Sequence, residues 1–234
     1  MANLLKSGAA CKDIEVAGSS SEPGRREQNR LDRAERIREA ASSLFKRHGY
    51  GSATMRQIAK RAHVGLGTLF NYADDKRDLV FLIFNEELAR LTEAAFAANK
   101  GKDLIGRLLA IYRCHYDYFG SKPELSRILL QELTFYSSGK QAGAFLQTRR
   151  RLIDGITSIV RTAQREIEIE STEDARFIAR HLFFVYSAAI RWWIAGRHPD
   201  PRAGIADLRR LLKLQVSGLA PATKRRTSRP SRTR

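Results

Sequence analysis

The chain of 234 residues is long enough for one or two domains with a substantial core, and its formal net charge at pH 7 is +17. Its two cysteines, Cys11 and Cys114, lie far apart without the spacing of metal ligands, so neither a disulfide scaffold nor a zinc site is indicated. No cofactor is expected. No stretch approaches the roughly twenty apolar residues of a membrane span, and no secretion signal is recognisable. These properties predict a soluble, cytoplasmic protein without a membrane partner.

An amphipathic helix of about five turns is predicted before Gly49. Apolar residues recur there at three- and four-residue intervals, and Gly49 suits the left-handed position that follows a helix end. Arg25, Arg26 and Arg30 are expected just before this helix, where a basic arm can reach the DNA minor groove. The recurring residues are Leu31, Ala34, Ile37, Ala41, Leu44, Phe45 and His48.

A short helix that begins after Thr54 is predicted by a capping box. The Thr54 hydroxyl suits the N-cap position, and Gln57, three residues later, can reach back to the N-cap backbone N–H. Ile58 and Ala62 then share one face. His63 tolerates a left-handed backbone better than most residues, so the chain can turn sharply there.

A second short helix is predicted after Gly65, which is an acceptable N-cap. If Leu69 faces the core, the opposite side is the one that a recognition helix offers to the DNA major groove. That side carries Leu66, Gly67, Phe70 and Asn71. Any helical protein can contain two short helices joined by a turn, so the neighbouring segments decide between the two interpretations.

A long fourth helix over residues 76–98 follows, with Asp74 and Asp75 as its cap. Together these segments resemble the N-terminal DNA-binding domain of the TetR/AcrR family of bacterial transcriptional regulators. The matching pieces are Ala40 to Phe45, His48 to Tyr50, Thr54 to Ala62, Gly67 to Tyr72, and Lys76. The resemblance implies an all-α protein, with a three-helix helix-turn-helix domain followed by a helical ligand-binding and dimerisation domain.

The DNA contacts are assigned by position in this motif. Gly65 and Leu66 stand where the family usually has a hydroxyl cap and a lysine, so the phosphate contacts are expected to depend more on other cations. Arg56, Phe70, Asn71 and Tyr72 are candidates for base or phosphate contacts, and Thr54, Lys60 and Lys76 for phosphates. The complete predicted set is Arg25, Arg26, Thr54, Arg56, Lys60, Gly65, Leu66, Gly67, Phe70, Asn71, Tyr72 and Lys76.

Four segments are predicted along the chain. Residues 1–24 are a disordered N-terminal extension, 25–75 the DNA-binding domain, 76–219 the effector-binding and dimerisation domain, and 220–234 a disordered basic tail. Residues 221–234 hold six of the positive charges and no acidic residue. The tail is either a nonspecific polyanion-binding arm or merely a solubilising segment.

The second half of the chain is predicted to be helical throughout and to form a homodimer. Residues 172–195 are apolar nearly all round, so this helix must be buried on every side, and the last helix runs from Asp200 to Gly218. In a domain this small, such burial suggests that the two helices pair with those of a second copy.

Aromatic residues of this half either line a ligand pocket or form plain core and interface. The family resemblance implies an effector site among these helices. The candidate lining residues are Tyr112, His115, Tyr116, Phe145, Arg149, His181 and Phe184.

An enzyme is not predicted. The histidines sit in no nucleophile, metal or phosphate-loop signature, and Glu166, Glu168 and Glu170 look like a solvated face rather than a catalytic pair. The predicted function is a sequence-specific regulator of transcription, a repressor that a small, largely apolar ligand releases from double-stranded DNA. The alternatives are a nonspecific architectural nucleic-acid-binding protein and an interaction protein whose last helices bind a different chain.

Overall fold

The computed structural model describes residues 24–218, and within this range all regular structure is helical. This confirms the predicted all-α class. The predicted disordered extension at residues 1–24, apart from Gly24, and the predicted basic tail at 220–234 lie outside the described residues. The helices are α1 (Arg25–Ser52), α2 (Met55–Arg61), α3 (Leu66–Phe70), α4 (Lys76–Ala97), α5 (Leu104–Ser121), α6 (Pro123–Glu132), the 3₁₀ helix η1 (Leu133–Phe135), α7 (Ala142–Arg165), α8 (Ala175–Ile194) and α9 (Pro201–Gly218).

Helix α1 begins earlier than the sequence pattern predicted. Arg25, Arg26 and Arg30 lie within its first turns and not in an arm before it, because nothing between Gly24 and Leu31 interrupts the helical backbone and Glu27 pairs with Arg30 at 2.6 Å. Leu31 and His48, at the two ends of the predicted apolar stripe, are exposed. The helical geometry breaks at Gly49, whose φ of 78° confirms the predicted helix end.

Local signals set the boundaries of α2 and α3. The Thr54 hydroxyl accepts a hydrogen bond from the Gln57 N–H at 3.2 Å, and the Thr54 N–H donates to Oε1 of Gln57 at 2.9 Å, which confirms the capping box. His63 turns the chain with a φ of 53°. Gly65 is the N-cap of α3, and Leu69 is fully buried beneath that helix.

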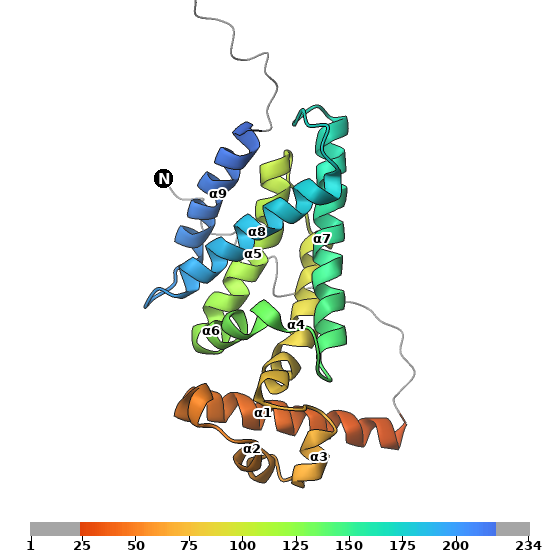
Figure 1. Cartoon of the computed structure of the whole chain (residues 1–234), viewed down its shortest axis with the longest axis vertical. Helices are drawn as coiled ribbons and strands as arrows, with labels where there is room; N and C mark the ends of the chain where they lie inside the picture. Colours follow the sequence, from red (N-terminus) through yellow and green to blue (C-terminus); the bar gives the residue numbers. More distant parts are fainter. Residues whose placement is uncertain (1–23, 219–234) are drawn as a thin grey trace, which may run out of the picture.

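Helix α4 connects the two parts of the molecule (Figure 1). Asp75 caps it by accepting a hydrogen bond from the Asp78 N–H at 2.8 Å. It packs against α1 and also contacts α5, α6 and α7. Helices α1 to α3 therefore form one end of the molecule, and α4 runs from them into the bundle.

Helices α5 to α9 form that bundle, in which α7 packs along α4 and α8, and α9 lies against α5 and α8. The approach of α9 to α5 is close, since a Cβ atom on Gly204 would lie 2.5 Å from the ring of Tyr116. A side chain there would separate the two helices, so the glycine fixes their spacing. The space between α4, α5, α6, α7 and α8 holds a cavity that is described below.

Candidate nucleic-acid interface and ligand cavity

The outer face of α3 is the candidate reading surface. Gly67 and Asn71 are exposed and Phe70 is 41% exposed, while Leu69 points into the core. A Cβ atom on Gly67 would meet no heavy atom within 4 Å, so the space beside it is open. Leu66 differs from the prediction, because it is half-buried and packs against the core. Three of the four residues predicted for this face therefore lie on it fully.

Helix α2, which precedes α3 in the chain, carries exposed basic side chains. Arg56, in the first turn of α2, and Lys60 are both exposed. The Thr54 hydroxyl donates to Oε1 of Gln57 at 2.9 Å, so its hydrogen is already used in the cap. Gly65 provides no side-chain cap for α3, which leaves the first backbone N–H groups of that short helix without a side-chain partner.

Tyr72 and Lys76 form internal contacts that hold α1, the end of α3 and the start of α4 together. The Tyr72 hydroxyl donates to the carbonyl of Arg30 at 3.0 Å. The Lys76 ammonium donates to the carbonyls of Tyr50 and Gly51 at 2.8 and 3.0 Å and lies 5.0 Å from the ring centre of Tyr50. Most of the hydrogen-bonding capacity of Lys76 is therefore directed at the end of α1 rather than at solvent.

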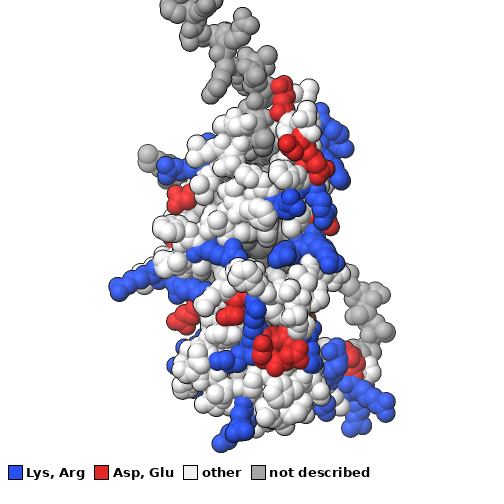
Figure 2. Space-filling view, in the orientation of Figure 1, with Lys and Arg blue, Asp and Glu red and all other residues white. Residues whose placement is uncertain are grey.

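A groove beside α3 contains residues predicted from the sequence together with two cations that were not predicted. It lies between α1, α3 and the turn before α7, and Arg33 and Lys140 are additional cations in it. The groove is lined by Arg30, Arg33, Thr68, Asn71, Tyr72, Lys140 and Gln141. Figure 2 shows basic side chains projecting at the lower right, where α1 begins. Helical spacing from Arg30 could have indicated Arg33, whereas Lys140 reaches the groove only through the tertiary fold.

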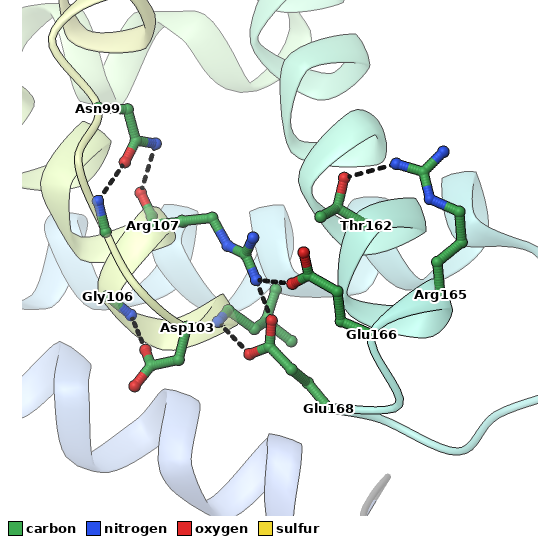
Figure 3. Close-up of polar contacts among 10 residues, drawn as sticks. Asn99, Asp103, Gly106, Arg107, Thr162, Arg165, Glu166 and Glu168 are labelled. Carbon is green, nitrogen blue, oxygen red and sulfur yellow. Dashed lines mark hydrogen bonds and ion pairs between the residues drawn. The ribbon is translucent and has the colours of Figure 1, made fainter.

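Glu166 and Glu168 near the end of α7 form an ion-pair cluster (Figure 3), whereas Glu170 is exposed, as predicted for a solvated face. Arg107 of α5 contacts the carboxylates of both Glu166 and Glu168, and Glu168 also accepts the Leu104 N–H at 2.6 Å. The hydrogen bond from Arg107 lowers the pKa of Glu166. These contacts fasten the start of α5 to the end of α7. The role of Glu166 and Glu168 here is structural.

A partly open cavity of about 90 Å³ lies between α4, α5, α6, α7 and α8, with mostly apolar walls. Three of the seven predicted ligand residues, His115, Phe145 and Arg149, line it. The sequence missed Asn85, Leu88, Thr92, Phe119, Leu129, Leu130, Leu133, Thr148, Leu152, Phe183, Tyr186, Ser187, Ile190 and Arg191, which also line it.

The other four predicted residues lie elsewhere. Tyr112 is buried and stacked on Tyr186, with ring centres 4.1 Å apart, and Tyr116 packs against Trp193. His181 is exposed and bonds Gln215 at 2.9 Å, and Phe184 is 58% exposed. The aromatic pattern could not separate the cavity wall from the core and the outer surface, because all three are apolar.

Four polar residues distinguish the cavity wall. Burial lowers the pKa of His115 to about 4, while Nδ1 of this residue lies 3.2 Å from the carbonyl of Ile111. Arg191 donates to the carbonyls of Ser187 and Leu130, and burial lowers its pKa as well. Within residues 24–218, neither Arg149 nor Arg191 forms an ion pair. The fourth is Asn85, whose Oδ1 is buried without a hydrogen-bond partner.

An exposed apolar face runs along α8 and α9. Phe177, Phe184 and Trp192 recur on one side of α8, and Trp192 is 85% exposed. Leu211 and Leu214 add to it from α9, with 38% and 70% of their surface exposed. Helix α8 is thus buried on one side only in the single chain, and its remaining apolar side is uncovered.

The part of the chain that the structure describes contains no group of three or more His, Cys, Asp or Glu residues that could hold a metal ion. None of its helices combines the length and the apolar character that crossing a membrane requires.

Comparison with known families gives a match over the helix-turn-helix and the start of α4. Residues 37–83 match the family model described as bacterial regulatory proteins, tetR family. Residues 37–83 are thus similar to the DNA-binding domain of tetR-family regulators. This confirms the resemblance read from the motifs, and the related proteins are transcriptional regulators.

Curated relatives of the chain match it over part of their length. The HTH-type transcriptional repressor AcnR of Corynebacterium diphtheriae is 26% identical over 103 residues, which cover 44% of this chain and 53% of AcnR. The HTH-type transcriptional regulator YhgD of Bacillus subtilis is 37% identical over 65 residues, or 28% of this chain and 34% of YhgD. The aligned part of the chain thus spans about half of AcnR and a third of YhgD.

Solved structures of transcriptional regulators share the fold over most of the chain. Thermus thermophilus FadR in complex with lauroyl-CoA has a TM-score of 0.62 at 23% identity and covers 85% of this chain and 99% of its own. Bacillus subtilis FadR in complex with stearoyl-CoA has a TM-score of 0.62 at 20% identity and covers 79% and 98%. At these identities the likeness concerns the fold.

Proposed function

We propose that the protein is a sequence-specific DNA-binding regulator of transcription, and that a small molecule in the cavity releases it from its operator. The observation that carries the proposal is the outer face of α3, with Gly67, Phe70 and Asn71 directed to solvent at one end of the molecule. The second helix of a helix-turn-helix places such a face in the major groove. Arg56, Lys60 and the first turns of α1 would supply phosphate contacts beside it.

The active species in this proposal is a homodimer. The large apolar side chains that α8 and α9 expose support it, because exposed apolar patches on soluble proteins mark interaction surfaces. Dimers are typical of the family. A dimer places two α3 helices in successive major grooves, which requires a spacing of about 34–36 Å.

The proposed ligand has an apolar body and an acidic group. The apolar walls of the cavity suit the former, and Arg149 and Arg191, which lack carboxylate partners within residues 24–218, suit the latter. The two FadR structures of the same fold were solved with lauroyl-CoA and stearoyl-CoA, which are molecules of this general kind.

The ligand would act through α4. This helix contributes Asn85, Leu88 and Thr92 to the cavity, and its first residue, Lys76, is bonded to the end of α1. A ligand that binds one tilt of α4 more tightly shifts the population toward dimers whose α3 helices no longer match the groove spacing.

The direct test is recovery and sequencing of genomic fragments that bind the purified protein, followed by titration of lauroyl-CoA into the complex. Enrichment of one sequence motif, with release by micromolar lauroyl-CoA, is the expected result. Fragments without a shared motif, bound with a steep dependence on salt, would instead indicate an architectural nucleic-acid-binding protein. Failure to bind DNA until another chain is added would indicate an interaction protein.

A further inference from the structure

Asn85 on α4 is oriented by two oxygen atoms of one residue. The Asn85 side-chain Nδ2 donates to the carbonyl of Gln141 at 3.0 Å and lies 3.4 Å from Oε1 of Gln141. The opposite orientation of the amide would place oxygen against oxygen, so these contacts fix which end faces Gln141.

The oxygen atom of this amide lacks a hydrogen-bond donor. Asn85 is 8% exposed and lines the cavity, and its Oδ1 is buried with no hydrogen-bond partner within residues 24–218. A buried acceptor without a donor is unfavourable and rare in native structures. A group that enters the cavity and carries an N–H or O–H can satisfy it.

Gln141 connects this wall of the cavity to the DNA-binding unit. Its side-chain Nε2 donates to the carbonyl of Tyr72 at 3.0 Å, and Tyr72 lies just beyond the end of α3. The Tyr72 hydroxyl in turn holds the carbonyl of Arg30 in α1. Two hydrogen bonds through Gln141 therefore separate the cavity residue Asn85 from the end of the recognition helix.

The turn that carries Gln141 is held tightly against α4. The buried carboxylate of Asp78 accepts the N–H groups of Asp74, Lys140 and Gln141 at 2.9, 2.8 and 3.1 Å. Gly139 has a φ of 116°, and a Cβ atom there would lie 2.6 Å from Oδ1 of Asp78. Because the turn is fixed in this way, a displacement of Gln141 must also displace its partners, including Tyr72.

We propose that Asn85 is the residue through which a ligand in the cavity acts on the recognition helix. Its Oδ1 accepts a hydrogen bond from a hydroxyl or N–H group of the ligand, and its Nδ2 passes the resulting movement to Gln141 and Tyr72. The inference rests on the proposed function in that a ligand occupies this cavity, and it adds a chemical requirement, a hydrogen-bond donor on an apolar ligand.

The connection to the recognition helix is tested without DNA or ligand, by amide hydrogen exchange. Gln141→Leu removes the donor to Tyr72, and we expect exchange in residues 69–73 to rise about two- to tenfold, which corresponds to one hydrogen bond. Asn85→Leu, of similar shape, should raise the same amides about twofold. Gln147→Leu, at an exposed position of α7, is the control and should leave them unchanged. Unchanged hydrogen exchange in Gln141→Leu would overturn the connection. This measurement does not depend on whether Asn85→Leu folds.

The requirement for a hydrogen-bond donor is tested with 1-dodecanol and dodecyl methyl ether. In the ether a methyl group replaces the hydroxyl hydrogen, so the ether cannot donate a hydrogen bond. The alcohol should raise the thermal midpoint of the wild type more than the ether does, and the difference should disappear in Asn85→Leu. Equal stabilisation by both probes, or stabilisation by neither, would overturn the assignment of Asn85 Oδ1 as a ligand acceptor. Failure of the genomic selection would refute the proposed function and leave the exchange result standing, so the two failures are distinguishable.

Discussion

Replacing Asp78 with asparagine tests whether the turn before α7 is fastened to α4 as the structure indicates. Asp78 is 1% exposed, and its two carboxylate oxygens together accept three backbone N–H groups and the hydroxyl of Tyr136. Asparagine has one acceptor oxygen and an NH₂ group that is itself a donor. In the variant, the two donors that bond one of the carboxylate oxygens would therefore face the NH₂ group instead.

The expected loss of stability follows from the number of unsatisfied groups. Each buried donor left without an acceptor costs about 1–3 kcal/mol, and the Tyr136 hydroxyl can rotate to accept, so one or two donors remain unpaired. We expect Asp78→Asn to lower the free energy of unfolding by about 3 kcal/mol.

Urea unfolding at pH 7.5 measures this loss. Asp207→Asn removes the same charge from an exposed side chain, 74% accessible and 3.8 Å from Arg210, and should change stability by less than about 0.5 kcal/mol. Gly139→Ala should destabilise as well, because of its φ of 116°. A loss in Asp78→Asn no larger than that in Asp207→Asn would refute the argument that these hydrogen bonds hold the turn.

Three further predictions concern pH, assembly and DNA contact. Because burial lowers the pKa of His115 to about 4, its unfolded form binds a proton at higher pH than its folded form, so stability falls as pH drops from about 6.5 toward 4. Urea unfolding measures the free energy of unfolding at pH 7.5 and at pH 5.0. The decrease between the two pH values should be about 2 kcal/mol smaller in His115→Gln than in the wild type, and an equal decrease would contradict the prediction. Trp192→Asp, at a side chain 85% exposed, should convert dimers to monomers in sedimentation at micromolar concentration, and a wild type that is already monomeric would rule out the dimer. Arg56→Ala should lower operator affinity about tenfold with unchanged thermal stability, whereas Lys76→Ala should lower both, because its ammonium holds the end of α1. If both variants bound the operator like the wild type, these cations would not carry the phosphate contact.

Local signals in the sequence predicted much of the helix-turn-helix. The Thr54 capping box, the Asp75 cap and the break at Gly49 each depend on residues within a few positions of one another, so the chain order alone reveals them. The start of α1 was missed because the residues from Arg25 onward lack an apolar period yet continue a helix whose stripe begins at Ala34. Periodicity reports burial, and this turn of α1 is exposed.

The cavity and its connection to α3 depend on long-range contacts that no local pattern reveals. Asp78 and the Gln141 N–H are 63 positions apart, and Asn85 is 56 positions from Gln141. Nothing in the local sequence separates Asn85 and Arg191 from the other polar residues of α4 and α8, and only the packing of α7 against α4 and α8 places them at one cavity. Tyr112 illustrates the converse, since an aromatic residue on the expected helix lies outside the cavity wall because its ring is stacked on Tyr186.

Base-resolved hydroxyl-radical footprinting of a selected genomic fragment shows whether the outer face of α3 reads DNA. We predict two protected half-sites whose centres lie about one helical turn, 10–10.5 base pairs, or a multiple of it apart, and loss of this protection in Asn71→Ala. Uniform protection along the fragment, or an unchanged footprint in Asn71→Ala, would contradict the claim that the outer face of α3 reads DNA.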